Sequence, residues 1–422
     1  MLRTKIKSRL ARNTLWMSMG QGLRLLIQAV YFTVIARALG VTNYGSFIGV
    51  AALVGILYPF GALGSGHLLI KEVARDRRRF PVAWGDALTT SAVCGTLLVA
   101  VVLGVSRFAL PGAIPMQLVL AIAAADIPGL CLITIAGQSF QAFEQLHWMA
   151  AIHVVVSTNR LLGALILVLL YRHPTALQWG SMYLGRTTVT ATAASAAVFI
   201  RLGAPRFIWR RSTEALWNGF HFSVSLSAQT IYNDIDKTML ARIGTLNATG
   251  IYGAAYRVID VSFAPVQALL YSAYPNFFRA GHAGICSSFS YAKPLLRRAV
   301  GYGLLIACGV LIFAGAVPFL LGAEYAETSA ALRWLSPLPV LKATHYFLAD
   351  TLTGAGYQGL RSGIQAVVAV FNVLINLWLI PRYSWVGAAW ASVASDALLA
   401  LSVGAAVGIL SRTSRKLVEV ER

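Results

Sequence analysis

Residues 229–256 read Gln-Thr-Ile-Tyr-Asn-Asp-Ile-Asp-Lys-Thr-Met-Leu-Ala-Arg-Ile-Gly-Thr-Leu-Asn-Ala-Thr-Gly-Ile-Tyr-Gly-Ala-Ala-Tyr. The stretch places Asn233, Asp234, Asp236 and Lys237 inside a segment that otherwise has the character of a membrane span. A charge at bilayer depth costs about 2.5–3.5 kcal/mol on insertion scales, so these residues require a wet cavity or polar partners. The stretch therefore predicts a membrane protein whose polar interior has a function.

A weaker copy of the same pattern lies near the N-terminus. Its members are Gln28, Tyr31, Ala36-Arg37, Gly40 and Tyr44-Gly45, in the order of Gln229, Tyr232, Ala241-Arg242, Gly244 and Tyr252-Gly253. Membrane transporters are often built from such internal repeats, with the substrate site where the repeats meet. The sequence thus predicts a duplicated transporter with its working surface between two halves.

Composition agrees with a membrane location. The 422 residues are 57% hydrophobic and only 12% charged, with a mean hydropathy of +0.68. The net charge of +20 does not require a nucleic-acid partner, because basic residues concentrate in the cytoplasmic loops of membrane proteins. The four cysteines lie far apart without a C-x-x-C pair, so we expect neither a disulfide nor a metal site.

Long apolar runs predict about twelve transmembrane helices, each near the roughly 20 residues that cross a bilayer. The predicted spans are 14–36, 46–70, 83–106, 116–141, 148–170, 178–200, 216–241, 251–275, 298–320, 328–356, 362–381 and 385–410. The prolines of Ser336-Pro-Leu-Pro339 should kink or break the tenth span.

The spans divide into two six-helix lobes, residues 1–205 and 206–422. Because each lobe has an even number of spans, the two should be related by a pseudo-two-fold axis along the membrane normal. Most Lys and Arg residues lie in alternate loops and in both tails. The positive-inside rule therefore predicts that both termini are cytoplasmic.

Several cations fall inside the predicted spans. Arg24 and Arg160 have no acidic residue within one helical turn, and a guanidinium stays charged when buried and grips phosphate oxygens in a fork. The candidate residues for a cationic, substrate-binding cavity are Arg24, Arg160, Lys237, Arg257 and Lys342. The alternative is that each one pairs with a carboxylate on its own or a neighbouring helix, as Asp234 with Lys237 or Arg257 with Asp260.

The polar and acidic residues of the spans admit two roles. A carboxylate in a membrane cavity could take up and release an ion or a proton during transport, or it could neutralise a nearby cation. The candidates for ion or proton coupling, or for charge pairing, are Asp126, Asn233, Asp234 and Asp236.

Motifs of catalysis are absent from the sequence. It contains no G-x-x-x-x-G-K-[ST], H-E-x-x-H or G-x-S-x-G, and its loops are short. We therefore expect no enzyme activity, no cofactor and no ATP binding by a P-loop.

Two segments resemble a known family. Asn233–Gly244 with Gly250–Arg257 resembles the seventh and eighth helices of Wzx-type polysaccharide flippases, and Ala36–Phe47 followed by Gly64–His67 resembles their first helices. These flippases belong to the MOP (multidrug/oligosaccharidyl-lipid/polysaccharide) exporter superfamily. The resemblance implies two six-helix lobes around a central cavity, and it implies functional importance for the positions that match, Asn233, Asp234, Asp236, Lys237 and Arg257.

The resemblance further implies transport of undecaprenyl-pyrophosphate-linked oligosaccharides across the bacterial inner membrane, for exopolysaccharide or O-antigen synthesis. The expected partners are this lipid-linked substrate, membrane lipids and other polysaccharide-assembly proteins. The alternative is an ion-coupled antiporter for drugs or organic cations from the same superfamily. An acidic cavity would favour that alternative, whereas the predicted spans carry slightly more cations than anions.

Overall fold

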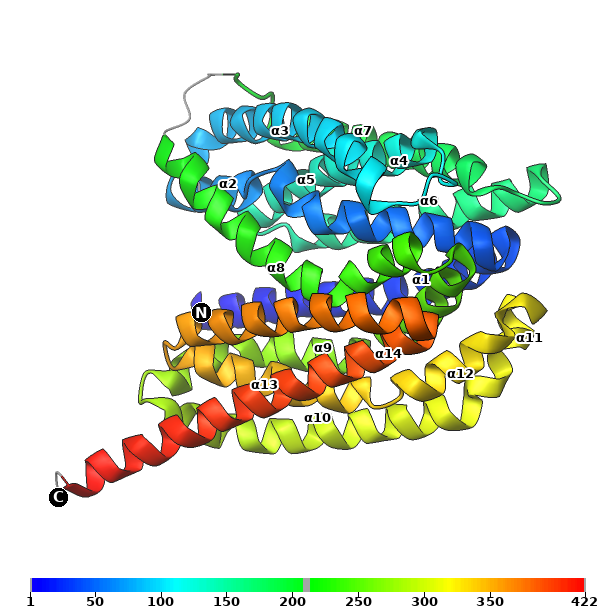
Figure 1. Cartoon of the computed structure of the whole chain (residues 1–422). Helices are drawn as coiled ribbons and strands as arrows, with labels where there is room; N and C mark the ends of the chain where they lie inside the picture. The colour runs from blue at the N-terminus through cyan, green and yellow to red at the C-terminus, as the bar shows by residue number, and fades with distance from the viewer. Residues whose placement is uncertain (1, 208–212, 421–422) are drawn as a thin grey trace. The chain divides into compact units, whose positions relative to one another are not determined.

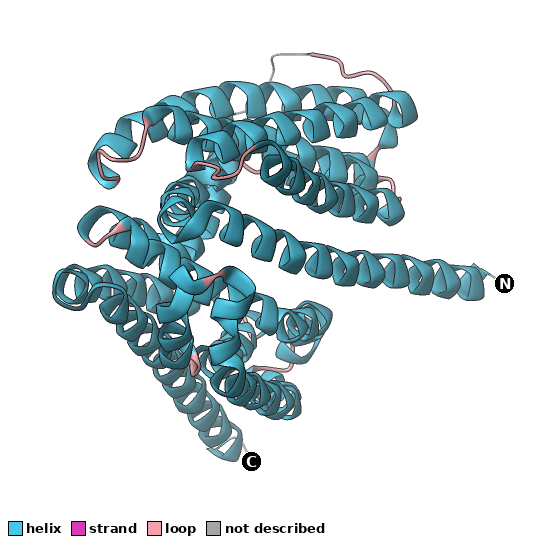
Figure 2. Cartoon of the chain, turned by 90° about the vertical axis from the view of Figure 1, so that its right-hand side faces the viewer, coloured by secondary structure: helices cyan, strands magenta, loops and turns pink. Residues whose placement is uncertain are grey.

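The computed structural model describes residues 2–207 and 213–420, which form helices joined by short loops, with no strand among them (Figures 1 and 2). The chain divides into two compact units, Met1–Thr230 and Ile231–Arg422. The predicted all-α architecture is confirmed.

The first unit contains seven α-helices and the start of an eighth, counted over the described residues. They are α1 (Leu2–Leu57), α2 (Ser65–Arg75), α3 (Phe80–Ala109), α4 (Met116–Ala124), α5 (Leu130–Ala142), α6 (Leu146–Leu170), α7 (Ala176–Leu202) and the first part of α8 (Thr213–Ile243). Buried side chains of α2, α3, α5, α6 and α7, among them Trp84 and Phe140, form one continuous apolar core.

The second unit is built from the end of α8 and the helices that follow it. These are α9 (Leu246–Gly281), α10 (Ile285–Phe313), α11 (Val317–Leu321), α12 (Ala326–Leu335), α13 (Leu338–Gly354) and α14 (Gln358–Val420). Helices α9, α10 and α13 share a core around Phe277 and Phe347, and α14 packs on α10 and α13 around Leu352 and Val403.

The division between the units lies within α8, later than the lobe boundary expected at 205/206. The first part of α8 packs on the first unit. There the Ser223 hydroxyl donates a 2.8 Å hydrogen bond to the Pro59 carbonyl, and Phe220 lies against Phe60. The charge and composition near residue 205 predict a loop there. The contacts of Phe220 and Ser223 nevertheless assign the helical segment after that loop to the first unit.

Two long helical runs each join two predicted spans. Helix α1 bends at Gly40, whose φ of 69° is a left-handed value that glycine adopts without strain. Helix α14 bends at Ser384 (φ 52°), shortly after Pro381. Both bends lie between predicted spans, so the helical content matches the expected layout.

Four predicted spans are interrupted. The break at Ser336-Pro-Leu-Pro339 is confirmed, because α12 ends at Leu335 and α13 begins at Leu338. Three further interruptions were not expected. The ninth span contains the 3-10 turn η4 (Ala314–Ala316) between α10 and α11. The second span breaks at the 3-10 turn η1 (Tyr58–Gly61), and the fourth contains a π-helical turn, η3 (Ala125–Gly129), with Pro128 inside it.

Six helical segments of the described chain are long and apolar enough to cross a membrane. They are Gly22–Arg75, Arg77–Ala109, Met116–Ala142, Leu146–Leu170, Ile285–Leu321 and Gln358–Ser414. Large apolar side chains such as Leu169, Ile200 and Phe319 are exposed on these and other helices, as lipid contact requires. The protein is therefore a multi-pass membrane protein, and its other long helices are the more polar ones.

A glycine pair at one helix crossing gives a stability prediction. A Cβ added to Gly281 at the end of α9 would lie 1.9 Å from the carbonyl oxygen of Gly354 in α13, and backbone cannot move aside as a flexible side chain can. We expect Gly281→Ala to destabilise the protein by about 1–3 kcal/mol, as overpacking does. Thermal unfolding in detergent measures the effect. Gly301→Ala, where the added Cβ meets no atom within 4 Å, is the matched control and should unfold at the wild-type temperature or above it.

Candidate functional site

Two lysines of the second unit approach one aromatic ring. The Lys237 ammonium, from α8, lies 4.1 Å from the centroid of the Tyr256 ring, and the Lys342 ammonium, from α13, lies 4.7 Å from it. Both lysine side chains are buried, with exposed fractions of 10% and 6%. Tyr256 on α9 thus holds two desolvated cations together, an arrangement in which cation–π attraction is strongest.

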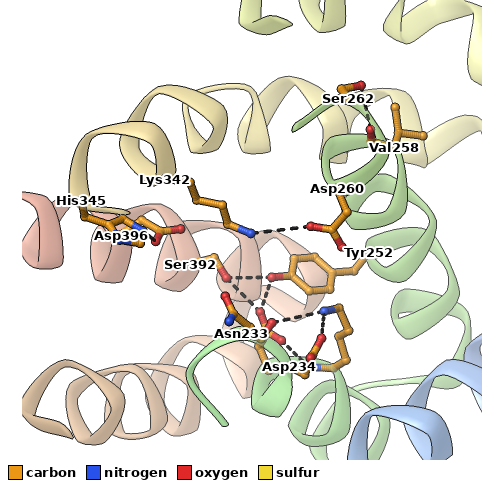
Figure 3. Close-up of polar contacts among 12 residues, drawn as sticks. Asn233, Asp234, Tyr252, Val258, Asp260, Ser262, Lys342, His345, Ser392 and Asp396 are labelled. Atoms are coloured by element: carbon orange, nitrogen blue, oxygen red, sulfur yellow. Dashed lines mark hydrogen bonds and ion pairs between the residues drawn. The ribbon is translucent and has the colours of Figure 1, made fainter. Parts of the chain in front are cut away.

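Each lysine also has a carboxylate partner (Figure 3). Lys237 forms the predicted ion pair with Asp234, one turn earlier on α8. The Lys342 ammonium lies 3.7 Å from Asp260 of α9. The side chains of Asp234 and Asp260 are 36% and 45% exposed. The carboxylates therefore form the accessible side of the cluster, and the lysines its buried side.

The expected pair of Arg257 with Asp260 is absent, because Asp260 shares a helix face with Tyr256 and turns toward Lys342 instead. Arg257 is half-buried and has no ion-pair partner among the described residues. Asn233 accepts a 3.2 Å hydrogen bond from the Lys237 ammonium through its backbone carbonyl.

Asp236 lies deeper than the other carboxylates and is 2% exposed. It accepts hydrogen bonds from the Tyr252 hydroxyl and, at 2.9 Å, from the Ser392 hydroxyl of α14 (Figure 3). Asp236 therefore ties α8, α9 and α14 together beneath the lysines. The contacts of this cluster join two lysines and three carboxylates, Asp234, Asp236 and Asp260, whereas the sequence suggested an excess of cations.

A second buried pair lies nearby on α13 and α14. His345 Nε2 and Asp396 Oδ1 are 2.9 Å apart and both residues are almost fully buried (Figure 3). His345 lies three residues after Lys342, so one face of α13 carries both polar contacts.

The first unit has its own polar cluster. The Arg160 guanidinium of α6 donates to the hydroxyl of Tyr183 on α7, which donates in turn to Asp126 in the π-helical turn. Arg160 and Asp126 are themselves 3.7 Å apart. The alternative reading of Arg160, a pair with a carboxylate on a neighbouring helix, is the one that the geometry favours. Arg24 is half-buried on α1, near enough to His153 of α6 for their charges to interact.

The tyrosines that organise these clusters were not among the residues predicted from the sequence. Tyr252, Tyr256 and Asp260 are spaced by four and share one face of α9. That polar stripe could have identified these three residues from the sequence. No local pattern identifies Tyr183 and Ser392, because their hydrogen-bond partners lie far away in the sequence.

Comparison with known proteins agrees with this architecture. An inward-facing MATE family multidrug resistance transporter of the MOP superfamily superimposes with a TM-score of 0.75 at 15% identity, over 92% of this chain and 96% of that one. The lipid II flippase MurJ, in an inward closed conformation, gives 0.76 at 10% identity, over 93% and 87%. The fold is therefore that of the MOP superfamily transporters.

Sequence comparison identifies the protein family within this fold. Residues 10–280, more than half of the chain, match the profile of the polysaccharide biosynthesis protein family, and the chain belongs to this family. It is also 22% identical over 395 residues to the probable low-salt glycan biosynthesis flippase Agl15 of Haloferax volcanii, covering 88% of this chain and 78% of the relative.

The Arg160 contact gives a second prediction. Arg160→Met removes the guanidinium and leaves the Asp126 carboxylate without its cation, so we expect a loss of about 1–3 kcal/mol of stability. Adding Asp126→Asn should recover part of that loss. Arg172→Met, at an exposed position of the same unit, is the control in thermal unfolding. Equal unfolding temperatures for Arg160→Met and Arg172→Met would show that the pair contributes nothing.

Proposed function

We propose that this protein is a flippase that moves polyprenyl-pyrophosphate-linked oligosaccharides across a membrane by alternating access, without ATP and without a catalytic step. In a bacterial host the substrate would be an undecaprenyl-pyrophosphate-linked repeat unit of an exopolysaccharide or O-antigen, carried across the inner membrane. Other polysaccharide-assembly proteins would supply and consume that substrate.

The observation that carries the proposal is the lysine pair on Tyr256. Lys237 and Lys342 present two ammonium groups within reach of one ligand, and a pyrophosphate offers two adjacent anionic centres. The partly exposed Asp234 and Asp260 orient the ammonium groups when no substrate is bound. An entering pyrophosphate can replace these carboxylates without leaving a buried charge unpaired, which is the costly state.

Family membership and the named relative support the same substrate class. The family is one of polysaccharide biosynthesis proteins, and the Haloferax relative is described as a glycan biosynthesis flippase. A lipid-linked sugar fits both names. The distribution of Lys and Arg in the loops supports an orientation with both termini in the cytoplasm.

One observation favours a second candidate, an antiporter for drugs or other organic cations. The lysine cluster contains three carboxylates, Asp234, Asp236 and Asp260, and a carboxylate-lined membrane cavity suits a cationic ligand. Lys237 and Lys342 count against an antiporter for cations, because they already neutralise the two exposed carboxylates.

The lysines can be tested by glycan export. In a strain lacking the gene, Lys237→Gln and Lys342→Gln should each lower surface polysaccharide about tenfold or more, since charge-assisted hydrogen bonds to the pyrophosphate are lost. Lipid-linked oligosaccharide should accumulate on the cytoplasmic leaflet. Lys293→Gln, at an exposed position of α10, should restore export fully when produced at the same level.

The same strains discriminate the candidates. Normal polysaccharide together with increased sensitivity to cationic dyes in the deletion strain would reject the flippase and favour the antiporter. Full export by both lysine variants would leave the flippase standing and remove the lysines from its site.

The orientation gives a separate prediction. Alkaline phosphatase, which is active only outside the cytoplasm, should be inactive when fused after residue 414 and active when inserted beside Arg172, in a predicted outer loop. The opposite pattern would invert the assigned orientation.

A further inference from the structure

The first unit contains a pocket that neither polar cluster uses. Its volume is about 120 Å³, and it lies where the second span is interrupted. The lining residues come from η1, the turn after it, the start of α2 and one face of α5; they are Tyr58, Pro59, Ala62, Gly64, Gly66, His67, Cys131, Thr134, Ile135 and Gln138. Irregular backbone at membrane depth occurs only where it is buried in protein or lines a cavity, and here it lines one.

The pocket lies on the part of the second span that leads to the predicted cytoplasmic surface. Helix α2 runs from Ser65 to Arg75, and its charged residues begin at Lys71 and Glu72. At 1.5 Å per residue, Ser65 lies about 9 Å along the helix from Lys71, which is less than half of a hydrocarbon core of roughly 30 Å.

The polar groups of this pocket are unusually placed for that depth. Gln138 is 9% exposed and makes no hydrogen bond with another described residue. Its side chain lies directly on Gly66, where an added Cβ would be 1.6 Å from Gln138 Oε1. The hydroxyls of Tyr58 and Thr134 are 3.1 Å apart, and Thr134 is exposed. An amide, two hydroxyls and an aromatic ring therefore converge on one space.

The chemistry of the lining selects the ligand. No carboxylate, lysine or arginine lines the pocket, although His67 does, so an ion would have no permanently charged partner there. A hydrocarbon chain would leave the buried Gln138 amide without a partner, which costs free energy. A neutral ligand rich in hydroxyl or acetamido groups satisfies the amide and the hydroxyls, and its apolar ring face can lie on Tyr58.

We propose that this pocket is a binding subsite for one neutral sugar residue of the transported oligosaccharide. The volume of about 120 Å³ is well below the roughly 300–1,000 Å³ of a complete small-molecule site, so the pocket suits one residue of an oligosaccharide rather than the whole of it. The inference rests on the proposed function and adds to it a site that recognises the glycan rather than the pyrophosphate. It also supplies hydrogen-bond partners for sugar hydroxyls at the depth where the bilayer offers none.

The test uses the full chain in lipid nanodiscs and measures the affinity for three probes. These are undecaprenyl pyrophosphate, and the same lipid carrying one N-acetylglucosamine or one glucose. Wild-type protein should bind at least one sugar-bearing lipid about tenfold more tightly than the sugar-free lipid. Gln138→Leu and Thr134→Val should each reduce that preference about fivefold, the effect of one lost hydrogen bond, with sugar-free binding unchanged.

Ser139→Ala is the matched control. Ser139 follows Gln138 on α5 and is buried, but its hydroxyl bonds to the Ile135 carbonyl of its own helix, outside the pocket. Its sugar preference should equal that of the wild type. Thr134→Val keeps the test decisive if Gln138→Leu unfolds, because Thr134 is exposed.

The outcomes separate the two proposals. Equal binding of all three lipids by the wild type, or a sugar preference that survives in both pocket variants, would overturn the sugar subsite and leave the flippase untouched. Failure to bind any of the lipids more tightly than phosphatidylglycerol would overturn the proposed function itself.

Discussion

The absence of water inside a bilayer is the constraint on which this structure depends. Each buried charge must find its partners within protein, since an isolated one is too costly to keep. Lys237 and Lys342 meet this requirement by sharing Tyr256 and pairing with Asp234 and Asp260. These contacts join helices that are distant in sequence, so the polar residues that complicate insertion also fix the packing of α8, α9 and α13.

The same constraint explains why the functional features coincide with interrupted helices. A broken span exposes backbone polar groups, and these are tolerated only beside polar partners or a cavity. The π-helical turn carries Asp126 to Tyr183 and Arg160. The pocket around Gln138 lies at the break in the second span, and Lys342 follows the break between α12 and α13 by one turn. These three helix interruptions thus lie beside charged residues or residues that line a pocket.

The sequence predicted the helices well, because apolar length is a property of contiguous residues. It also predicted the Asp234–Lys237 pair, whose members share one turn of α8. It did not predict the partners of Arg160 or Asp260, because these contacts join different helices and no local spacing encodes them. The breaks at η1 and η3 had a local signal, Pro59 and Pro128, but a proline in a membrane helix is often accommodated without a break. The Gln138 pocket needs α2 and α5 side by side, which only the fold provides.

The two charged clusters differ in a way that bears on their roles. In the first unit, Asp126 and Arg160 are both largely buried and are bridged by the Tyr183 hydroxyl. A ligand would have to displace these contacts, although the buried Arg160 Nε has no hydrogen-bond partner among the described residues. In the second unit the two carboxylates that pair with the lysines, Asp234 and Asp260, are the exposed members and the lysines are the buried ones. A phosphate can therefore take the place of a carboxylate there and meet cations that are already desolvated and oriented. Much of the cost of preparing an anion site is then met by folding rather than by binding. Under the proposed function, Arg160 would serve mainly the architecture of its unit, and Lys237 and Lys342 would serve the substrate.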